Sequence, residues 1–82
     1  MLTSAELEAL TSVERRLVIA KRTLPGAAVC RLMRANNKTT RGLAQQMDIT
    51  QARVREVREG GLNRALFIKD WVEAITRSGA AS

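Results

Sequence analysis

The sequence predicts an all-α fold, a compact domain of five to six helices that takes in residues 1–82. Three observations support this class. Apolar residues recur at spacings of three and four in several segments, which is the period of an amphipathic helix. Residues that cap helix starts precede these segments. No stretch shows the apolar and polar alternation of a half-buried strand, and 82 residues with 45% hydrophobic content suit a single folded domain.

Residues 1–24 form the first predicted helical segment. Thr3 and Glu6 stand three apart in the pattern of a capping box, in which each side chain accepts a backbone N–H of the other residue. Thr11 and Glu14 repeat this pattern, so we expect a brief helix and then a second one that ends near Thr23. The apolar positions of the second helix are Val13, Leu17, Ile19 and Ala20.

The next helix is expected from Pro25 to about Ala35. Proline is favoured in the first turn of a helix, where its missing N–H costs nothing. Asn36 and Asn37 then end the helix, because asparagine tolerates turn and left-handed conformations. Cys30 lies in the apolar stripe of this helix and is interpreted as a small buried hydrophobic residue rather than a redox sensor. The remaining apolar residues of the stripe are Ala28, Val29, Leu32 and Met33.

Two short helices with a three-residue turn are predicted within residues 40–59. Leu43, Ala44 and Met47 share one face of the first helix, and Val54 and Val57 share one face of the second. A turn this short makes the helices cross steeply, so a small residue is needed at the contact, and Ala44 meets that need. The turn consists of Asp48, Ile49, which we expect to fill the corner, and Thr50, which we expect to cap the second helix.

A last helix is predicted over residues 63–76. Gly60 and Gly61 end the helix before it, and Asn63 is placed to cap the new one. Its apolar residues occupy more than one stripe, which is wider than a small core usually needs. Phe67, Trp71 and Ile75 are spaced by four and either complete the core against Val54 and Val57 or form a dimer interface. Both readings are open at this stage, and residues 77–82 are expected to be a disordered tail.

Basic residues are concentrated in one part of the chain. There are 14 Lys and Arg against 8 Asp and Glu, which gives a net charge of +6, and most of the basic residues are Arg. The stretch 15–41 contains no acid and eight basic residues: Arg15, Arg16, Lys21, Arg22, Arg31, Arg34, Lys38 and Arg41. Such a stretch favours binding to a polyanion, and the alternative is an ordinary solvated basic face.

Several kinds of function are not expected. With no His and a single Cys, the usual ligands of zinc and iron–sulfur sites are missing. There is no glycine-rich phosphate loop and no nucleophile motif, so we expect neither an enzyme nor a cofactor. The longest apolar runs, of which residues 17–20 are one, are far too short to span a membrane, and the N-terminus lacks a signal-peptide pattern. These features predict a cytoplasmic protein.

The block from Thr40 to Glu59 resembles the helix-turn-helix of Xre/Cro-type transcriptional regulators, and the resemblance extends over roughly Val29 to Ile75. It implies that Thr39 caps the first helix of the motif and that Thr40 contacts a DNA phosphate. Two positions depart from the family pattern. Asp48 occupies the turn position where glycine is usual, and Lys38 occupies a position that is usually apolar.

The second helix of the motif carries side chains suited to double-stranded DNA. Arginine can donate to guanine O6 and N7, glutamine can pair with adenine, and alanine can contact a thymine methyl group. The predicted base-reading residues are Gln51, Ala52 and Arg55. The predicted phosphate-binding residues are Arg34, Lys38, Thr40, Arg41, Thr50, Arg53 and Arg58.

These observations predict a sequence-specific transcriptional repressor that binds an inverted-repeat operator as a homodimer, of the type that the resemblance associates with phages and plasmids. A short chain buries only part of its surface, which favours self-association. No small-molecule effector is expected. The alternative is an antitoxin-like protein-interaction module with secondary DNA binding. RNA binding is a weaker option, because Phe67 and Trp71 are the only aromatic residues available for stacking on bases.

Overall fold

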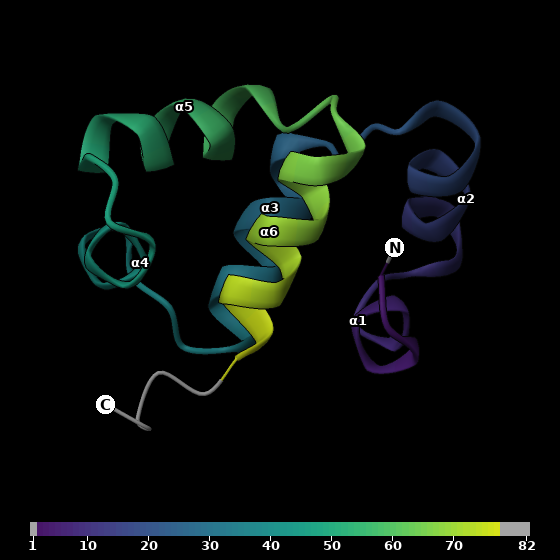
Figure 1. Cartoon of the computed structure of the whole chain (residues 1–82), viewed down its shortest axis with the longest axis horizontal. Coiled ribbons are helices and arrows are strands. Elements are labelled where there is room, and N and C mark those ends of the chain that lie inside the picture. The colour runs from purple at the N-terminus through teal and green to yellow at the C-terminus, as the bar shows by residue number, and fades with distance from the viewer. Residues whose placement is uncertain (1, 78–82) are drawn as a thin grey trace.

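The computed structural model describes residues 2–77 and shows an all-helical fold. The helices of the described residues, drawn in Figure 1, are α1 (Ser4–Glu8), α2 (Ser12–Lys21), α3 (Gly26–Ala35), α4 (Thr40–Met47), α5 (Gln51–Gly60) and α6 (Ala65–Thr76). The fold class is therefore as predicted. Of the predicted disordered tail 77–82, residues 78–82 lie outside the described part. Arg77 is described, follows α6 and pairs with Glu73 at 2.7 Å.

The helices α3 and α6 pack against each other in the middle of the molecule, with α4 and α5 on one side and α1 and α2 on the other (Figure 1). One continuous core joins these elements. It consists of Leu10, Leu24, Ala28, Val29, Leu32, Met33, Leu43, Ala44, Val54, Val57, Leu62, Ile68, Trp71, Val72 and Ile75. Most of these residues stand at the helical spacings noted in the sequence, so periodicity identified most of the core.

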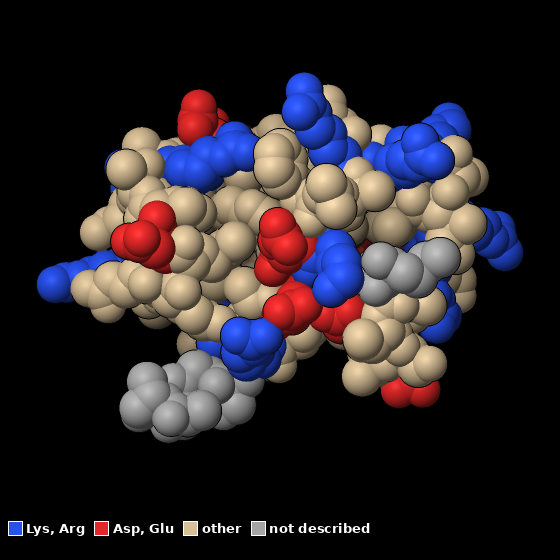
Figure 2. Space-filling view, viewed as in Figure 1, with Lys and Arg blue, Asp and Glu red and all other residues tan. Residues whose placement is uncertain are grey.

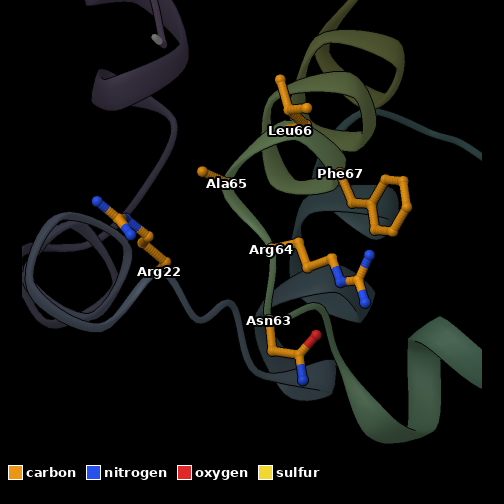
Figure 3. A pocket seen from close by; sticks show the side chains of 6 residues that line it. All are labelled: Arg22, Asn63, Arg64, Ala65, Leu66 and Phe67. Carbon is orange, nitrogen blue, oxygen red and sulfur yellow. The ribbon is translucent and has the colours of Figure 1, made fainter.

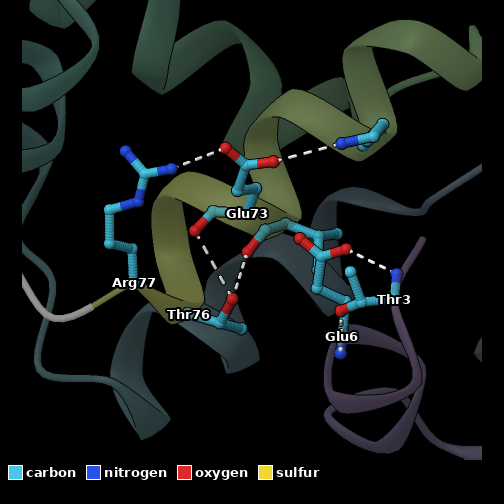
Figure 4. Close-up of polar contacts among 7 residues, drawn as sticks. Thr3, Glu6, Glu73, Thr76 and Arg77 are labelled. Carbon is cyan, nitrogen blue, oxygen red and sulfur yellow. Dashed lines mark hydrogen bonds and ion pairs between the residues drawn. The ribbon is translucent and has the colours of Figure 1, made fainter. Parts of the chain in front are cut away.

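Both predicted capping boxes are present. The Thr3 N–H donates to Glu6 Oε1 at 2.7 Å, and the Glu6 N–H donates to Thr3 Oγ1 at 3.2 Å. Thr11 and Glu14 make the same pair of bonds at 2.9 and 3.1 Å. Glu6 is buried, and the capping box supplies the partner that a buried carboxylate needs (Figure 4).

Left-handed residues end α3 and α4. Asn37, at φ 55°, follows α3, and Asp48, at φ 58°, follows α4. After α4 the Ile49 N–H donates to the Ala44 carbonyl at 2.9 Å and the Asp48 N–H to Gln45 at 3.3 Å, which is the bonding pattern of a Schellman motif. Asp48 thus adopts the left-handed backbone conformation for which glycine is usual after a helix.

Three local predictions are corrected. Pro25 precedes α3 as its N-cap, because its ψ of 152° is extended rather than helical. Asn63 does not cap α6, which begins two residues later with Arg64 at the cap position and no side-chain hydrogen bond there. In α2 the predicted apolar face is wrong, since Val13 and Ile19 are 64% and 72% exposed. Val18, which was not predicted, packs against the core instead.

A two-residue bridge closes the chain around α3, α4 and α5. The Leu24 N–H donates to the Leu62 carbonyl and the Leu62 N–H to the Leu24 carbonyl, each at 2.8 Å. Gly61 makes this approach possible, because its φ is +77° and a Cβ atom there would lie 2.3 Å from the Leu24 carbonyl oxygen. Glycine at 61 is therefore required by the fold, whereas a Cβ at Gly60 would meet nothing within 4 Å.

Arg31 attaches the first two helices to the rest of the fold. Its guanidinium donates to the Ala9 carbonyl at 3.1 Å and to both carboxylate oxygens of Glu14. Partial burial by itself would raise the pKa of Glu14, but hydrogen bonds from Arg31 and from the Thr11 N–H outweigh it and hold that pKa below its ordinary value. One residue of the basic stretch thus serves internal packing.

Candidate nucleic-acid interface

The candidate interface is built on α4, α5 and the turn between them. Residues 48–50 join the helices, as predicted, and Figure 1 shows α5 lying across the view while α4 is seen end-on. Ala44 is buried at the contact, and Ile49 packs against the core. The Thr50 hydroxyl accepts the Arg53 N–H at 3.1 Å and caps α5. Thr39 caps α4 by accepting the Gly42 N–H at 2.9 Å.

Helix α5 exposes all of its surface except one narrow stripe. Val54 and Val57 are buried, and Arg58 is half-buried beside them. Helix α5 therefore packs against the core along one narrow side, and most of its surface is exposed. The exposed residues are Gln51, Ala52, Arg53, Arg55, Glu56, Glu59 and Gly60.

The three predicted base-reading residues lie together on this exposed surface. Gln51 and Ala52 occupy the first turn of α5, and Arg55 follows one turn later on the same side as Gln51. All three are exposed, so the protein's own chain does not occlude them. They carry hydrogen-bonding and apolar groups that are complementary to those that base pairs present in the major groove of DNA.

The predicted phosphate-binding residues divide into two groups. The side chains of Arg34, Arg41 and Arg53 are exposed. Within residues 2–77 their guanidinium groups make no hydrogen bond and no ion pair. Thr50 is also exposed, although its hydroxyl is used by the cap. The other group, Lys38, Thr40 and Arg58, makes contacts within the fold.

Arg58 connects three helices. One terminal nitrogen of its guanidinium donates to Thr40 Oγ1 at 2.7 Å, and its Nε lies 3.5 Å from Cys30 Sγ. The thiol in turn donates to the Arg58 carbonyl at 3.5 Å. Arg58 thus fixes the position of α5 relative to α3 and α4. The interpretation of Cys30 as a small buried hydrophobic residue is corrected as well, because it is half-buried and takes part in this polar contact.

Lys38 is held in a second contact chain. Its Nζ donates to Gln46 Oε1 at 2.8 Å, and Gln46 Nε2 donates to the Ala74 carbonyl at 2.8 Å. This chain links the segment before α4 to the C-terminal half of α6. Lys38, which departs from the usual apolar residue of the Xre/Cro pattern, therefore has a hydrogen-bond partner within the fold. Spacing in the sequence gives no sign of this contact, because it depends on how α4 and α6 meet.

The basic stretch 15–41 does not form one surface. Figure 1 shows α2 and α4 on opposite sides of the α3 and α6 pair, so the cations of α2 lie far from α4. In Figure 2 blue side chains lie over α5 and over α2, while red ones gather near the centre, over α6. The cations close to the candidate interface are accordingly those of α4 and α5, together with the end of α3.

The tentative dimer interface is corrected by the burial of its residues. Trp71 is 4% exposed and Ile75 is fully buried, so both belong to the monomer core, as the alternative reading held. Phe67 remains partly exposed, at 40%, and its neighbour Leu66 is 75% exposed. Two apolar side chains therefore stand at the surface at the start of α6, although they are not the set that the spacing of four suggested.

Leu66 and Phe67 line a hollow of about 480 Å³ between α2 and the start of α6. Figure 3 shows Arg22 at the end of α2 on one side and Arg64 beside the Phe67 ring, with the guanidinium carbon 5.8 Å from the ring centroid. The other lining residues are Asn63 and Ala65. The hollow was not predicted, because it joins the end of α2 to the start of α6, which are far apart in the sequence. The only sequence signal was the excess width of the last apolar segment.

No helix within residues 2–77 is long and apolar enough to cross a membrane. The same residues contain no group of three or more His, Cys, Asp or Glu side chains arranged to hold a metal ion. No protein-family model matches the chain, and neither a curated protein nor a solved structure is similar to it.

Proposed function

We propose that the protein is a sequence-specific double-stranded DNA-binding regulator, a repressor of the Xre/Cro type, that uses α5 to read base pairs in the major groove. The observation that supports this most directly is the exposure of Gln51, Ala52 and Arg55 on a helix that is anchored along one edge only. A DNA-reading helix needs a free outer surface of this kind and a rigid attachment.

In the proposed complex α5 lies in the major groove, with its first turns toward the bases. Arg55 donates to a guanine, Gln51 pairs with an adenine, and Ala52 contacts a thymine methyl group. Arg53, Arg41 and Arg34 contact phosphates, which sets the register without reading sequence. Arg58 and Thr40 hold the two helices in position. Occupation of a promoter by this complex would block transcription.

Selection of bound duplexes from a random DNA pool tests the proposal. We expect enrichment of one motif, arranged as an inverted repeat with half-site centres about 34 Å apart if two copies bind together. Arg55→Ala is expected to cost about 1–3 kcal/mol on the selected site and to relax preference at one base position. Arg53→Ala is the matched control. It is expected to weaken binding to all sequences alike and to reduce the salt slope by about one unit.

Two outcomes would contradict the proposal. If the wild-type protein enriches no motif and retards no duplex at physiological salt, it is not a sequence-specific DNA-binding protein. If it does enrich a motif and Arg55→Ala discriminates as the wild type does, the DNA-binding role stands and the choice of base-reading residue is wrong.

The hollow at the start of α6 favours a second candidate function, that of an antitoxin-like protein-interaction module. Exposed Leu66 and Phe67 offer apolar contact, and Arg22 and Arg64 place positive charge at the rim. This combination suits a segment of a partner protein that carries both acidic and apolar side chains. Absence of DNA retardation together with binding to such a peptide, abolished by Leu66→Ser, would favour this function over DNA binding.

A further inference from the structure

Two acidic residues on the outer surface of α5, Glu56 and Glu59, have no role in the contacts proposed above. Both are exposed. The ion pairs within residues 2–77 lie elsewhere, between Glu14 and Arg31 and around Glu73. A carboxylate on a surface that approaches DNA is repelled by the phosphates. Acidic residues at these positions therefore weaken general affinity unless one of them makes a favourable contact of its own.

The helical repeat arranges the outer surface of α5 in two rows. Residues four apart lie above one another, so one row contains Gln51, Arg55 and Glu59 and the other contains Ala52, Glu56 and Gly60. Glu56 is the only long side chain of the second row. Its row neighbours are small, and the space at the Gly60 α-carbon is open to 4 Å. A base pair that approaches this row meets one carboxylate and little else.

We propose that Glu56 is a specificity-determining residue that accepts a hydrogen bond from the N4 amino group of a cytosine in the major groove. This inference rests on the proposed function. A carboxylate only accepts hydrogen bonds, and guanine and thymine present only acceptors in that groove. Cytosine offers its N4 donor alone, whereas adenine sets the N7 acceptor, which repels a carboxylate, beside its N6 donor. Glu56 therefore favours cytosine and rejects guanine or thymine at the same position. In this way the acidic side chain lowers the affinity for DNA in general and raises the discrimination between bases at one position.

Glu59 provides a matched control within the same helix. It has the same charge and is equally exposed, but it lies near the C-terminal end of α5. Base contacts of a DNA-reading helix come mainly from its N-terminal part, so Glu59 is expected to lie beyond the bases. Glu56→Gln and Glu59→Gln each remove one negative charge and keep the shape of the side chain. Any difference between the two variants therefore reports position rather than charge.

The experiment begins with selection of a motif by the wild-type protein from a random duplex pool, followed by the same selection with each variant. The wild-type motif is expected to contain a cytosine whose replacement by thymine weakens binding about 5- to 150-fold, the usual cost of one mismatched base pair. Glu56→Gln is expected to lose this preference while its affinity for random duplex rises. Glu59→Gln is expected to keep the preference. Melting of each variant by circular dichroism confirms that the fold is intact.

The possible results separate the inference from the proposed function. A wild-type motif with unchanged cytosine preference in Glu56→Gln overturns the role of Glu56 and leaves DNA recognition by α5 in place. Equal loss of preference in both variants overturns it too, because charge alone would then explain the effect. Failure of the wild-type protein to enrich any motif overturns the proposed function and this inference with it.

Discussion

Gly60 and Gly61 are adjacent in the sequence, yet substitution by alanine is expected to destabilise the fold at Gly61 and not at Gly60. Gly61 has φ +77° and ψ −165°, a region that essentially only glycine occupies, and a non-glycine residue there costs about 1–3 kcal/mol. A Cβ at 61 would also lie 2.3 Å from the Leu24 carbonyl oxygen and 2.8 Å from the Gly26 nitrogen. Both atoms belong to the backbone, so relief requires that the chain move, at a further cost of about 1–3 kcal/mol.

The reduced entropy of the unfolded chain offsets about 0.4–1 kcal/mol of this cost, which leaves a net loss of roughly 1–6 kcal/mol for Gly61→Ala. That loss is a large part of the roughly 4–12 kcal/mol expected for a domain of this length. Gly60→Ala meets no atom within 4 Å and places alanine at the end of a helix, so we expect it to be neutral or to stabilise by up to about 1 kcal/mol.

Urea unfolding of the three proteins measures both effects. Circular dichroism follows the helices, and fluorescence of the buried Trp71 follows the core. The expected order of midpoints is Gly60→Ala at or above wild type and Gly61→Ala well below it. If Gly61→Ala unfolds within about 0.5 kcal/mol of wild type, the close approach of Gly61 to Leu24 does not limit the fold, and the reasoning is refuted.

Three further predictions concern the turn, the N-terminal attachment and the helix contact. Asp48→Gly is expected to stabilise by about 0.5–1 kcal/mol in urea unfolding, because φ 58° suits glycine and an acid at a helix C-terminus is unfavourable, and a loss of stability would contradict this. The ion pair with Arg31 lowers the pKa of Glu14, so its stabilising effect is present above the unfolded pKa and is lost as pH falls through the folded pKa. Glu14→Gln should therefore be less stable than wild type at pH 7. The difference in unfolding free energy between the two proteins should decrease on acidification. A difference that stays constant with pH would mean that the pair does not act through ionisation. Arg58→Ala should destabilise the fold by about 1–2 kcal/mol through loss of the hydrogen bond to Thr40, whereas Arg53→Ala, which changes an exposed side chain, should not. Equal unfolding midpoints of these two variants would contradict the role of Arg58 in joining the helices.

The sequence predicted the elements of the fold well, because their signals are local. Capping boxes at Thr3 and Thr11 and the cap at Thr50 depend on residues three positions apart, and all are present. The asparagines after α3 and Asp48 after α4 were assigned to turns on the same kind of local information. The predicted start of α6 was wrong. Asparagine at position 63 is a residue type that caps helices, but Asn63 follows the Leu62 bridge and α6 begins only after Arg64.

What the sequence did not predict depends on contacts between distant segments. Nothing near Arg58 indicates that its guanidinium reaches Thr40 rather than solvent, and Arg31 looked like any other member of the basic stretch. The spacing of Trp71 and Ile75 was equally consistent with core and with interface. The burial of the two side chains assigns them to the core, because only the packing of α6 on α3 shows which side of α6 faces inward.

The bridge between Leu24 and Leu62 has a consequence for how the molecule comes apart. It joins the two ends of the segment that contains α3, α4 and α5, so we expect these helices to separate together. Helices α1 and α2 lie outside that segment and are attached through Leu10, Val18 and the Arg31 contacts. Amide hydrogens of α2 should accordingly exchange with solvent through openings that leave α5 protected, so the amino-terminal arm can detach while the surface proposed to meet DNA keeps its shape.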